Sequence, residues 1–123
     1  MVDIKKLFKS FGYAFEGIES ALKYNQNLRI HFLAAVLVIL AGFVLKLSPY
    51  EMSILALVIL LVLCAEMINT AIEEVVDLLV NEHRKEAKIA KDVSAGMVLL
   101  TAIGAVIIGI MIFLPHIQFF VRQ

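Results

Sequence analysis

The amino-acid sequence predicts an all-α integral membrane protein: a single membrane domain, residues 1–123, with an N-terminal amphipathic surface helix and three transmembrane helices. Of the 123 residues, 62% are hydrophobic and 18% are charged, and the mean hydropathy is +0.94. Soluble domains are about half apolar and about a quarter charged, so a water-soluble fold is excluded. The charged residues concentrate in residues 1–29 and 66–92, which leaves uncharged stretches long enough to span a bilayer.

Residues 4–24 are expected to form the surface helix. Large apolar side chains recur there at spacings of three and four, and the lysines mostly lie off that stripe, a pattern typical of an amphipathic helix. Two placements stay open, because the apolar face suits either the membrane surface or the side of the transmembrane helices. The stripe consists of Ile4, Leu7, Phe8, Phe11, Phe15, Ile18 and Leu22.

Two transmembrane helices are predicted at residues 30–47 and 50–79. The first is about 27 Å long at ~1.5 Å per residue, enough to cross the hydrocarbon core. The second follows a serine N-cap, a proline in the first turn and a glutamate three residues after the cap, which together match a capping box; these are Ser48, Pro49 and Glu51. At about 45 Å this helix exceeds the ~30 Å core, so its second half is expected to leave the bilayer.

The third transmembrane helix is predicted at residues 93–114, which carry no charge. Pro115 is expected to end it, because proline removes a helical hydrogen bond. Residues 80–90 are expected to form the connecting loop, although the alanines and charged residues of its second half could already be helical. Gly104 and Gly109 would let helices approach closely, or they are ordinary membrane-helix glycines.

The positions of lysine and arginine predict the orientation. Five precede the first predicted span and four follow the second, whereas only Lys46 and Arg122 lie on the opposite side. Because positively charged flanks stay in the cytosol, the N-terminus and the 80–90 loop are expected in the cytosol and the C-terminus outside. Acidic and basic residues balance at eleven each, so no overall basic field favours nucleic acid.

A polar stripe runs along the second predicted span. Glu66, Asn69, Glu73 and Asp77 fall within roughly 80° of one another on a helix. Glu66 lies about 24 Å from the outer boundary and therefore near the inner edge of the core, where a carboxylate costs on the order of 2 to 3 kcal/mol to insert. A structural hydrogen bond remains the alternative for Glu66, and simple solvation explains Asp77 equally well.

Lys91 and Asp92 open the third predicted span at a similar depth. Carboxylates facing a lysine at the inner interface indicate a divalent cation that holds a phosphate ligand, or a structural ion pair. The sequence contains no Walker A pattern, no kinase catalytic loop and no glycine-rich phosphate fingerprint. The residues alone therefore predict a polyvalent-ion site at the inner membrane face.

Several motifs resemble the small bacterial diacylglycerol kinase and undecaprenol kinase family. They are EMINTAIE at 66–73, VVD at 75–77, AKD at 90–92, the Ala95-Gly96 pair, NLRIH at 27–31 and the Gly12-Tyr13 pair. The resemblance covers nearly the whole chain. It implies a homotrimer of three-span subunits in the bacterial cell membrane that uses MgATP to phosphorylate a lipid hydroxyl, giving phosphatidic acid from diacylglycerol or undecaprenyl phosphate from undecaprenol.

The resemblance also implies roles for individual residues. Glu66 is similar to the family's catalytic base, and Glu73 to a ligand of both metal and nucleotide. The other nucleotide-binding positions would be Tyr13, Glu82, His83, Arg84, Lys91 and Asp92, with Asn69, Lys6 and Ala95 in supporting or substrate-contacting roles.

Asn25 departs from the family pattern, because many members carry a glutamate there as a second metal ligand. An amide oxygen can coordinate Mg²⁺ but contributes less charge, so this departure puts the affinity for the metal in question. Three hypotheses follow: a lipid kinase, a catalytically silent membrane-interaction homologue with a weakened metal site, and a channel subunit. The channel is the least favoured, because the outer half of the second span has no polar lining. The sequence does not choose between the two lipids.

Overall fold

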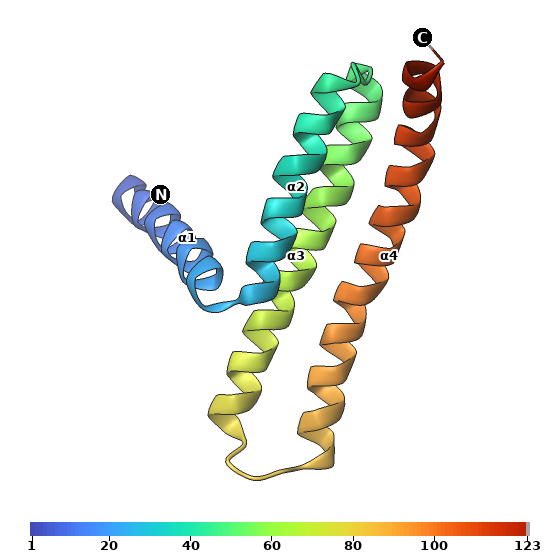
Figure 1. Cartoon of the computed structure of the whole chain (residues 1–123). Helices are drawn as coiled ribbons and strands as arrows, with labels where there is room; N and C mark the ends of the chain where they lie inside the picture. The colour runs from blue at the N-terminus through green and yellow to red at the C-terminus, as the bar shows by residue number, and fades with distance from the viewer. Residues whose placement is uncertain (123) are drawn as a thin grey trace.

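The computed structural model describes residues 1–122, which form four helices and confirm the all-α class (Figure 1). Helices α2, α3 and α4 are long and apolar enough to cross a membrane by length and composition. The helices are α1 (Ile4–Tyr24), α2 (Gln26–Val44), α3 (Pro49–Leu79) and α4 (Lys85–Val121).

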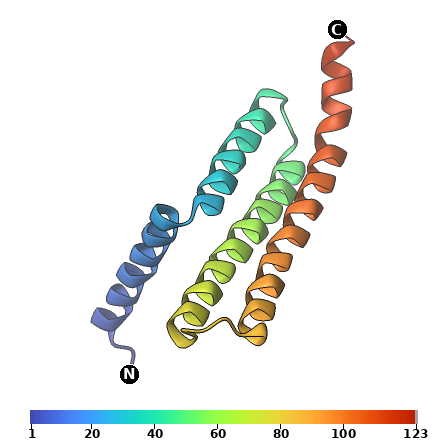
Figure 2. The same cartoon turned by 60° about the horizontal axis from the view of Figure 1, so that its bottom comes forward.

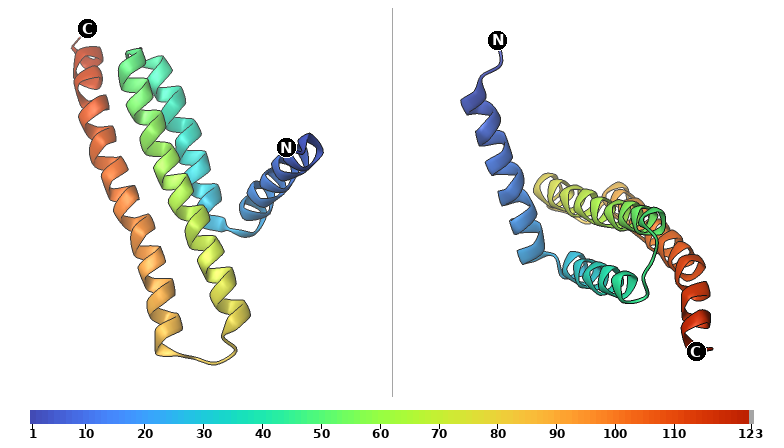
Figure 3. Two further views of the ribbon diagram at one scale, coloured as in Figure 1. Left: turned by 180° about the vertical axis from the view of Figure 1, so that it is seen from behind. Right: turned by 90° about the horizontal axis from the view of Figure 1, so that it is seen from above.

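Helix α3 is the central element of the bundle. It packs most extensively along α4 and over a shorter length along α2. Figures 1 and 2 show α3 and α4 side by side and antiparallel, closed at one end by the linker of residues 80–84. Helix α2 begins beside the middle of α3, so the last turns of α3 and the first turns of α4 extend past it (Figures 1 and 3). We call this projecting end, with the start of α2, the inner end of the bundle, and the opposite end the outer end.

Helix α1 diverges from the bundle at a sharp joint on Asn25 (Figure 3). The Asn25 backbone ends α1, and its side-chain oxygen starts α2 by accepting bonds from the backbone N–H groups of Asn27 (2.8 Å) and Leu28 (3.1 Å). The Arg29 guanidinium donates back to the carbonyl oxygen of Lys23 at the end of α1 (2.8 Å). Both bonds satisfy helix-end groups that would otherwise lack partners, so the joint is defined locally.

Helix α3 begins with the predicted capping box. The Ser48 hydroxyl accepts a bond from the Glu51 N–H (3.2 Å), and the Glu51 carboxylate accepts one from the Ser48 N–H (2.8 Å). The turn before it is tight, because a Cβ on Gly42 would lie 2.7 Å from the Met52 sulfur. In contrast, an added Cβ at Gly104 or Gly109 would meet no atom within 4 Å, so the close helix approach considered there is not made within the described chain.

Three sequence-based assignments need correction. The first span is Gln26–Val44 rather than residues 30–47, because the Asn25 side chain already caps the helix at Gln26. The connecting loop comprises residues 80–84 rather than 80–90, because α4 begins at Lys85. Helix-forming residues and an ion pair one turn apart, between Lys88 and Asp92, stabilise these first turns. The predicted stop at Pro115 is also wrong, since α4 continues to Val121. The turn after the proline is anchored by His116, whose Nε2 lies 2.9 Å from Glu51 Oε1 at the start of α3, and an unbroken helix leaves fewer backbone groups unpaired.

Candidate functional site

The inner end of the bundle contains a buried polar cluster. Glu66, Asn69 and Ser94 are the buried polar side chains among the described residues, with Glu66 only 2% exposed. Buried polar groups are unfavourable unless they are hydrogen-bonded, so each one needs a partner or a function. The sequence predicted Glu66 and Asn69 in one stripe, and the structure places both in the interior.

Glu66 is the least satisfied member of the cluster. Its Oε1 lies 3.6 Å from Nε2 of His31 on α2, which is longer than a hydrogen bond. Its Oε2 is buried without a hydrogen-bond partner in residues 1–122. A buried polar atom left unpaired costs about 1 to 3 kcal/mol, more when charged, and such exceptions often have a catalytic reason.

Asn69, in contrast, is fully engaged. Its Oδ1 accepts a bond from the Ser94 hydroxyl of α4 (2.6 Å), and its Nδ2 donates to Glu73 Oε1 (3.3 Å). Ser94 also lies 2.9 Å from the carbonyl oxygen of Lys91. Asn69 therefore links Glu73 to Ser94 of α4, and its supporting role at the site stays a prediction. Ser94 was not predicted from the sequence, although a serine one turn after Lys91 in an apolar run was a usable signal.

A small pocket of about 200 Å³ adjoins Glu73. Both lone pairs of the Asn25 oxygen are used by the α2 cap, and its Nδ2 donates to the Thr70 hydroxyl, which in turn donates to the Glu66 carbonyl oxygen (2.9 Å). A metal role for Asn25 would require the cap to open. The residues that line the pocket are Tyr24, Asn25, Gln26, Asn27, Thr70, Glu73 and Glu74.

A larger, charged pocket of about 510 Å³ surrounds the 80–84 linker. Lys91 Nζ lies 2.9 Å from Asp77 Oδ1 across the α3–α4 hairpin, and Asp92 pairs with Lys88. Five of the predicted nucleotide-binding residues line this pocket: Glu82, His83, Arg84, Lys91 and Asp92.

Three predicted site residues lie elsewhere. Tyr13 and Lys6 are exposed on α1, Tyr13 with 67% of its surface accessible, and Ala95 is exposed on α4. None of them lines the charged pocket or the pocket beside Glu73. Their predicted contacts with nucleotide or substrate stay predictions, because the described chain does not bring these side chains to the other site residues.

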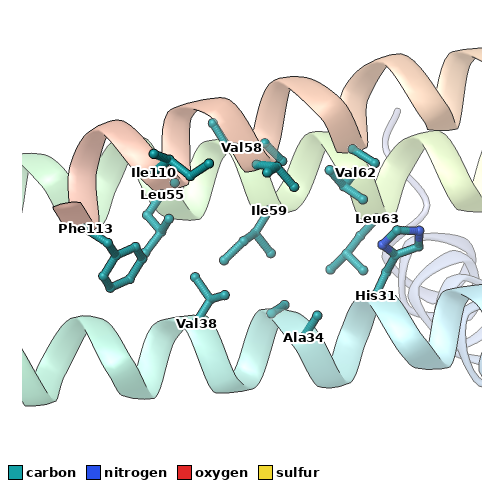
Figure 4. Close-up of a pocket in the computed structure, with 15 residues that line it drawn as sticks. His31, Ala34, Val38, Leu55, Val58, Ile59, Val62, Leu63, Ile110 and Phe113 are labelled. Atoms are coloured by element: carbon teal, nitrogen blue, oxygen red, sulfur yellow. The ribbon is translucent and has the colours of Figure 1, made fainter. Parts of the chain in front are cut away.

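An apolar groove of about 270 Å³ lies between α2, α3 and α4 and begins at His31, next to Glu66. Figure 4 shows side chains from α2, α3 and α4 facing it, with His31 at one end and Phe113 toward the other. The wall includes Ala34, Val38, Ile59 and Leu63, so His31 is its single ionisable lining residue. The sequence indicates only an interfacial residue at His31, and its position between the groove and Glu66 emerges from the structure.

Comparison with known proteins identifies the family of this chain. A family model described as "Prokaryotic diacylglycerol kinase" matches residues 12–113. The chain belongs to the prokaryotic diacylglycerol kinase family. It is therefore a lipid kinase, an ATP-dependent phosphotransferase of a prokaryotic membrane-protein family.

Individual relatives agree with this family assignment. The undecaprenol kinase of Bacillus subtilis is 40% identical over 115 residues, covering 94% of each chain. The diacylglycerol kinase of Synechocystis is 47% identical over 110 residues, which is 89% of this chain but 63% of that protein. The Escherichia coli diacylglycerol kinase is 28% identical over 111 residues, 90% of this chain and 91% of its own. These relatives give no support to the hypothesis of a catalytically silent homologue.

Proposed function

We propose that the protein transfers the γ-phosphate of MgATP to the hydroxyl of undecaprenol or diacylglycerol, producing undecaprenyl phosphate or phosphatidic acid. The observation that carries the proposal is the buried Glu66 carboxylate, whose Oε2 has no hydrogen-bond partner in the described chain and whose neighbour His31 lines the apolar groove. Each substrate would approach from its own phase. The lipid alcohol would reach Glu66 from the groove, and the nucleotide would enter from the charged side.

Glu66 is proposed as the general base. The hydroxyl oxygen of the lipid must lose its proton as it attacks phosphorus, and a positioned carboxylate within hydrogen-bond reach accelerates such a step by about 10² to 10⁴. Glu66 Oε2 has no competing partner in the described chain, so it can accept this proton. Asn69, held by Ser94, would keep the neighbouring Glu73 turned toward the nucleotide through its hydrogen bond to that carboxylate.

Glu73 is proposed as the principal ligand for Mg²⁺. Among residues 1–122, no group of three His, Cys, Asp or Glu side chains could hold a metal by itself. Mg²⁺ at phosphoryl-transfer sites commonly needs only one or two carboxylates, because substrate phosphates and water complete its shell. Glu73 and Glu74 line one pocket, which fits a metal that arrives with the nucleotide. When bound, the metal would neutralise part of the negative charge on the phosphates.

Lys91, Glu82, His83 and Arg84 are proposed to bind the nucleotide phosphates around the linker, with Asp92 beside them. Lys91 is held by Asp77, which points its ammonium group into the hairpin. The inner end, including the linker, is proposed to face the cytosol, as the lysine and arginine distribution predicts. This orientation supplies ATP directly to the charged pocket.

Helix α1 is proposed to lie on the inner membrane surface, with its phenylalanine stripe toward lipid. We further propose that three copies assemble into a homotrimer, as the family resemblance implies. The exposed apolar residues on α2, α3 and α4 and the open glycine positions of α4 leave surface for neighbouring subunits. In such an assembly, Tyr13 and Lys6 could complete the site of another copy.

The experiment is a lipid-substrate panel. Purified protein in bilayer nanodiscs receives radiolabelled ATP, Mg²⁺ and either undecaprenol or diacylglycerol, and transfer of label to lipid is measured. Undecaprenyl phosphate, which lacks a free hydroxyl, serves as the matched control lipid. We expect Mg²⁺-dependent labelling of at least one alcohol and none of the control. Similarity to the B. subtilis undecaprenol kinase makes undecaprenol a candidate substrate, and similarity to the Synechocystis diacylglycerol kinase makes diacylglycerol another. Labelling of neither alcohol by folded protein would refute the proposal.

A further inference from the structure

The contact between His31 and Glu66 is not accounted for by packing or by hydrogen bonding. His31 Nε2 lies 3.6 Å from Glu66 Oε1, and the two side chains are 28% and 2% exposed. The imidazole is therefore partly accessible, whereas the carboxylate that it approaches is sealed inside the bundle. A sealed general base has no direct path by which to lose a proton to water.

Other ionisable groups at the inner ends of the helices are not bonded to this pair. None of them forms an ion pair or a hydrogen bond with His31 or Glu66 within residues 1–122. On α1, Lys23 lies over the Tyr24 ring; on α2, Arg29 binds α1 carbonyl oxygens; on α3, Glu73 accepts a bond from Asn69; on α4, Lys91 pairs with Asp77. His31 is thus the titratable side chain placed to exchange a proton with Glu66.

We propose that His31 is a positioning residue for Glu66, which orients the carboxylate and accepts the proton that the carboxylate removes from the lipid hydroxyl. The proposal rests on the proposed role of Glu66 as general base. It assigns to His31 a function beyond that of lining the end of the apolar groove (Figure 4).

One proton moves through the pair in each turnover. The lipid oxygen forms a bond to the γ-phosphorus while its O–H proton passes to the Glu66 carboxylate. The bond from the γ-phosphorus to the bridging oxygen breaks, and ADP leaves with that electron pair. Protonated Glu66 then gives its proton to the Nε2 lone pair of His31 in its Nδ1–H tautomer. The imidazolium releases one proton to water at the inner end of α2, and proton exchange with that water returns the ring to the Nδ1–H tautomer, so that Nε2 can accept again. Glu66 is again a carboxylate, ready for the next lipid.

The test replaces the imidazole with groups of similar polarity that cannot carry a proton. In His31→Gln, kcat is expected to fall on the order of ten- to a hundredfold, at or below the lower limit for a direct general acid–base group, because His31 acts through Glu66. The KM values for MgATP and lipid should stay within about threefold, because the side chain acts after substrate binding.

Chemical rescue separates proton transfer from packing. In His31→Ala, added imidazole should restore kcat, whereas pyrazole, which has a similar shape but is a far weaker base, should not. His116→Gln is the matched control, because His116 also contacts a glutamate between α3 and α4 but lies far from the cluster; its kcat should remain within about twofold of the wild type. Folding of every variant is checked by circular dichroism, and His31→Asn replaces any variant that does not fold.

Three results would overturn the proposal: unchanged kcat in His31→Gln, a loss confined to the lipid KM, or equal rescue by imidazole and pyrazole. The proposed function can be judged separately. Full activity of Glu66→Gln would remove the general base itself, whereas an inactive Glu66→Gln beside a fully active His31→Gln would reject only the proton-accepting role of His31.

Discussion

The two ends of the helical bundle each pair a histidine with a glutamate, but they do so differently. At the outer end, His116 Nε2 lies 2.9 Å from Glu51 Oε1, and the other Glu51 oxygen accepts the Ser48 N–H in a capping box. At the inner end, His31 lies 3.6 Å from Glu66, whose second oxygen is buried without a partner in the described chain. The outer carboxylate has all of its oxygens bonded, so structure explains it fully.

Residue type alone therefore does not distinguish a structural pair from a functional one. A satisfied carboxylate at a helix start stabilises the fold through its cap and its interhelical bond. An unsatisfied buried carboxylate opposes folding and persists where the surrounding packing holds it. Through His31, the inner pair borders the apolar groove, whereas neither Glu51 nor His116 lines the groove or the two polar pockets.

The largest expected effect is in Glu66→Gln. Turnover should fall by at least about a thousandfold, within the range for loss of a general base, since the amide cannot take the hydroxyl proton. Stability should be unchanged or higher, because the substitution replaces a buried carboxylate whose Oε2 has no hydrogen-bond partner in the described chain. Lipid phosphorylation and unfolding in denaturing detergent are the measurements. Appreciable remaining turnover would make the inner glutamate as structural as the outer one.

A smaller, mixed effect is expected in Asn25→Glu. A carboxylate beside Glu73 should tighten Mg²⁺ binding by roughly three- to tenfold, because affinity for hard cations rises with ligand charge. Loss of the favourable asparagine cap and of its bond to Thr70 should reduce stability by about 1 kcal/mol. Titration of Mg²⁺ against kcat tests the first part, with Asn25→Gln as the neutral control. Equal Mg²⁺ affinity in all three proteins would mean that the metal is held without position 25.

The smallest effect on activity is expected in Glu51→Ala. This change removes both the capping box and the bond to His116, and should lower the free energy of unfolding by about 1 to 2 kcal/mol. The kcat should remain within about twofold of the wild type, because neither Glu51 nor His116 lines the groove or the two polar pockets. Ser53→Ala, which deletes a hydroxyl bonded only to the Pro49 carbonyl oxygen, is the matched control. A large loss of turnover in Glu51→Ala would erase the distinction between the two ends.

Local chemistry explains the features that were predictable. Hydrophobic periodicity and the Ser48 capping box predicted the start of α3, because these signals involve residues within one or two turns. The shared helix face of Glu66, Asn69 and Glu73 followed from helical spacing alone. The family also followed from local motifs, and the matching family model confirmed it.

The predicted stop at Pro115 failed because of a contact between distant segments, whereas the helix start at Lys85 rests on local helix propensity and a one-turn ion pair. Pro115 does not end α4, and the bond from His116 to Glu51 joins residues 65 positions apart. No local pattern shows that Asn25 donates to Thr70, or that Ser94 binds Asn69 across two helices. Such bonds depend on how α2, α3 and α4 pack, and packing geometry has no short-range signal.

By itself, the sequence determined that this chain is a bundle of apolar helices with a row of carboxylates along one of them, because hydrophobicity and helical period act locally. Only the tertiary structure decided which carboxylate is sealed and unpaired. Glu66 is buried because neighbouring helices cover it. Its Oε2 lacks a hydrogen-bond partner in the described chain because these helices place only His31 near the carboxylate. Burial and pairing are properties of the assembled helices, since each depends on side chains that other helices supply.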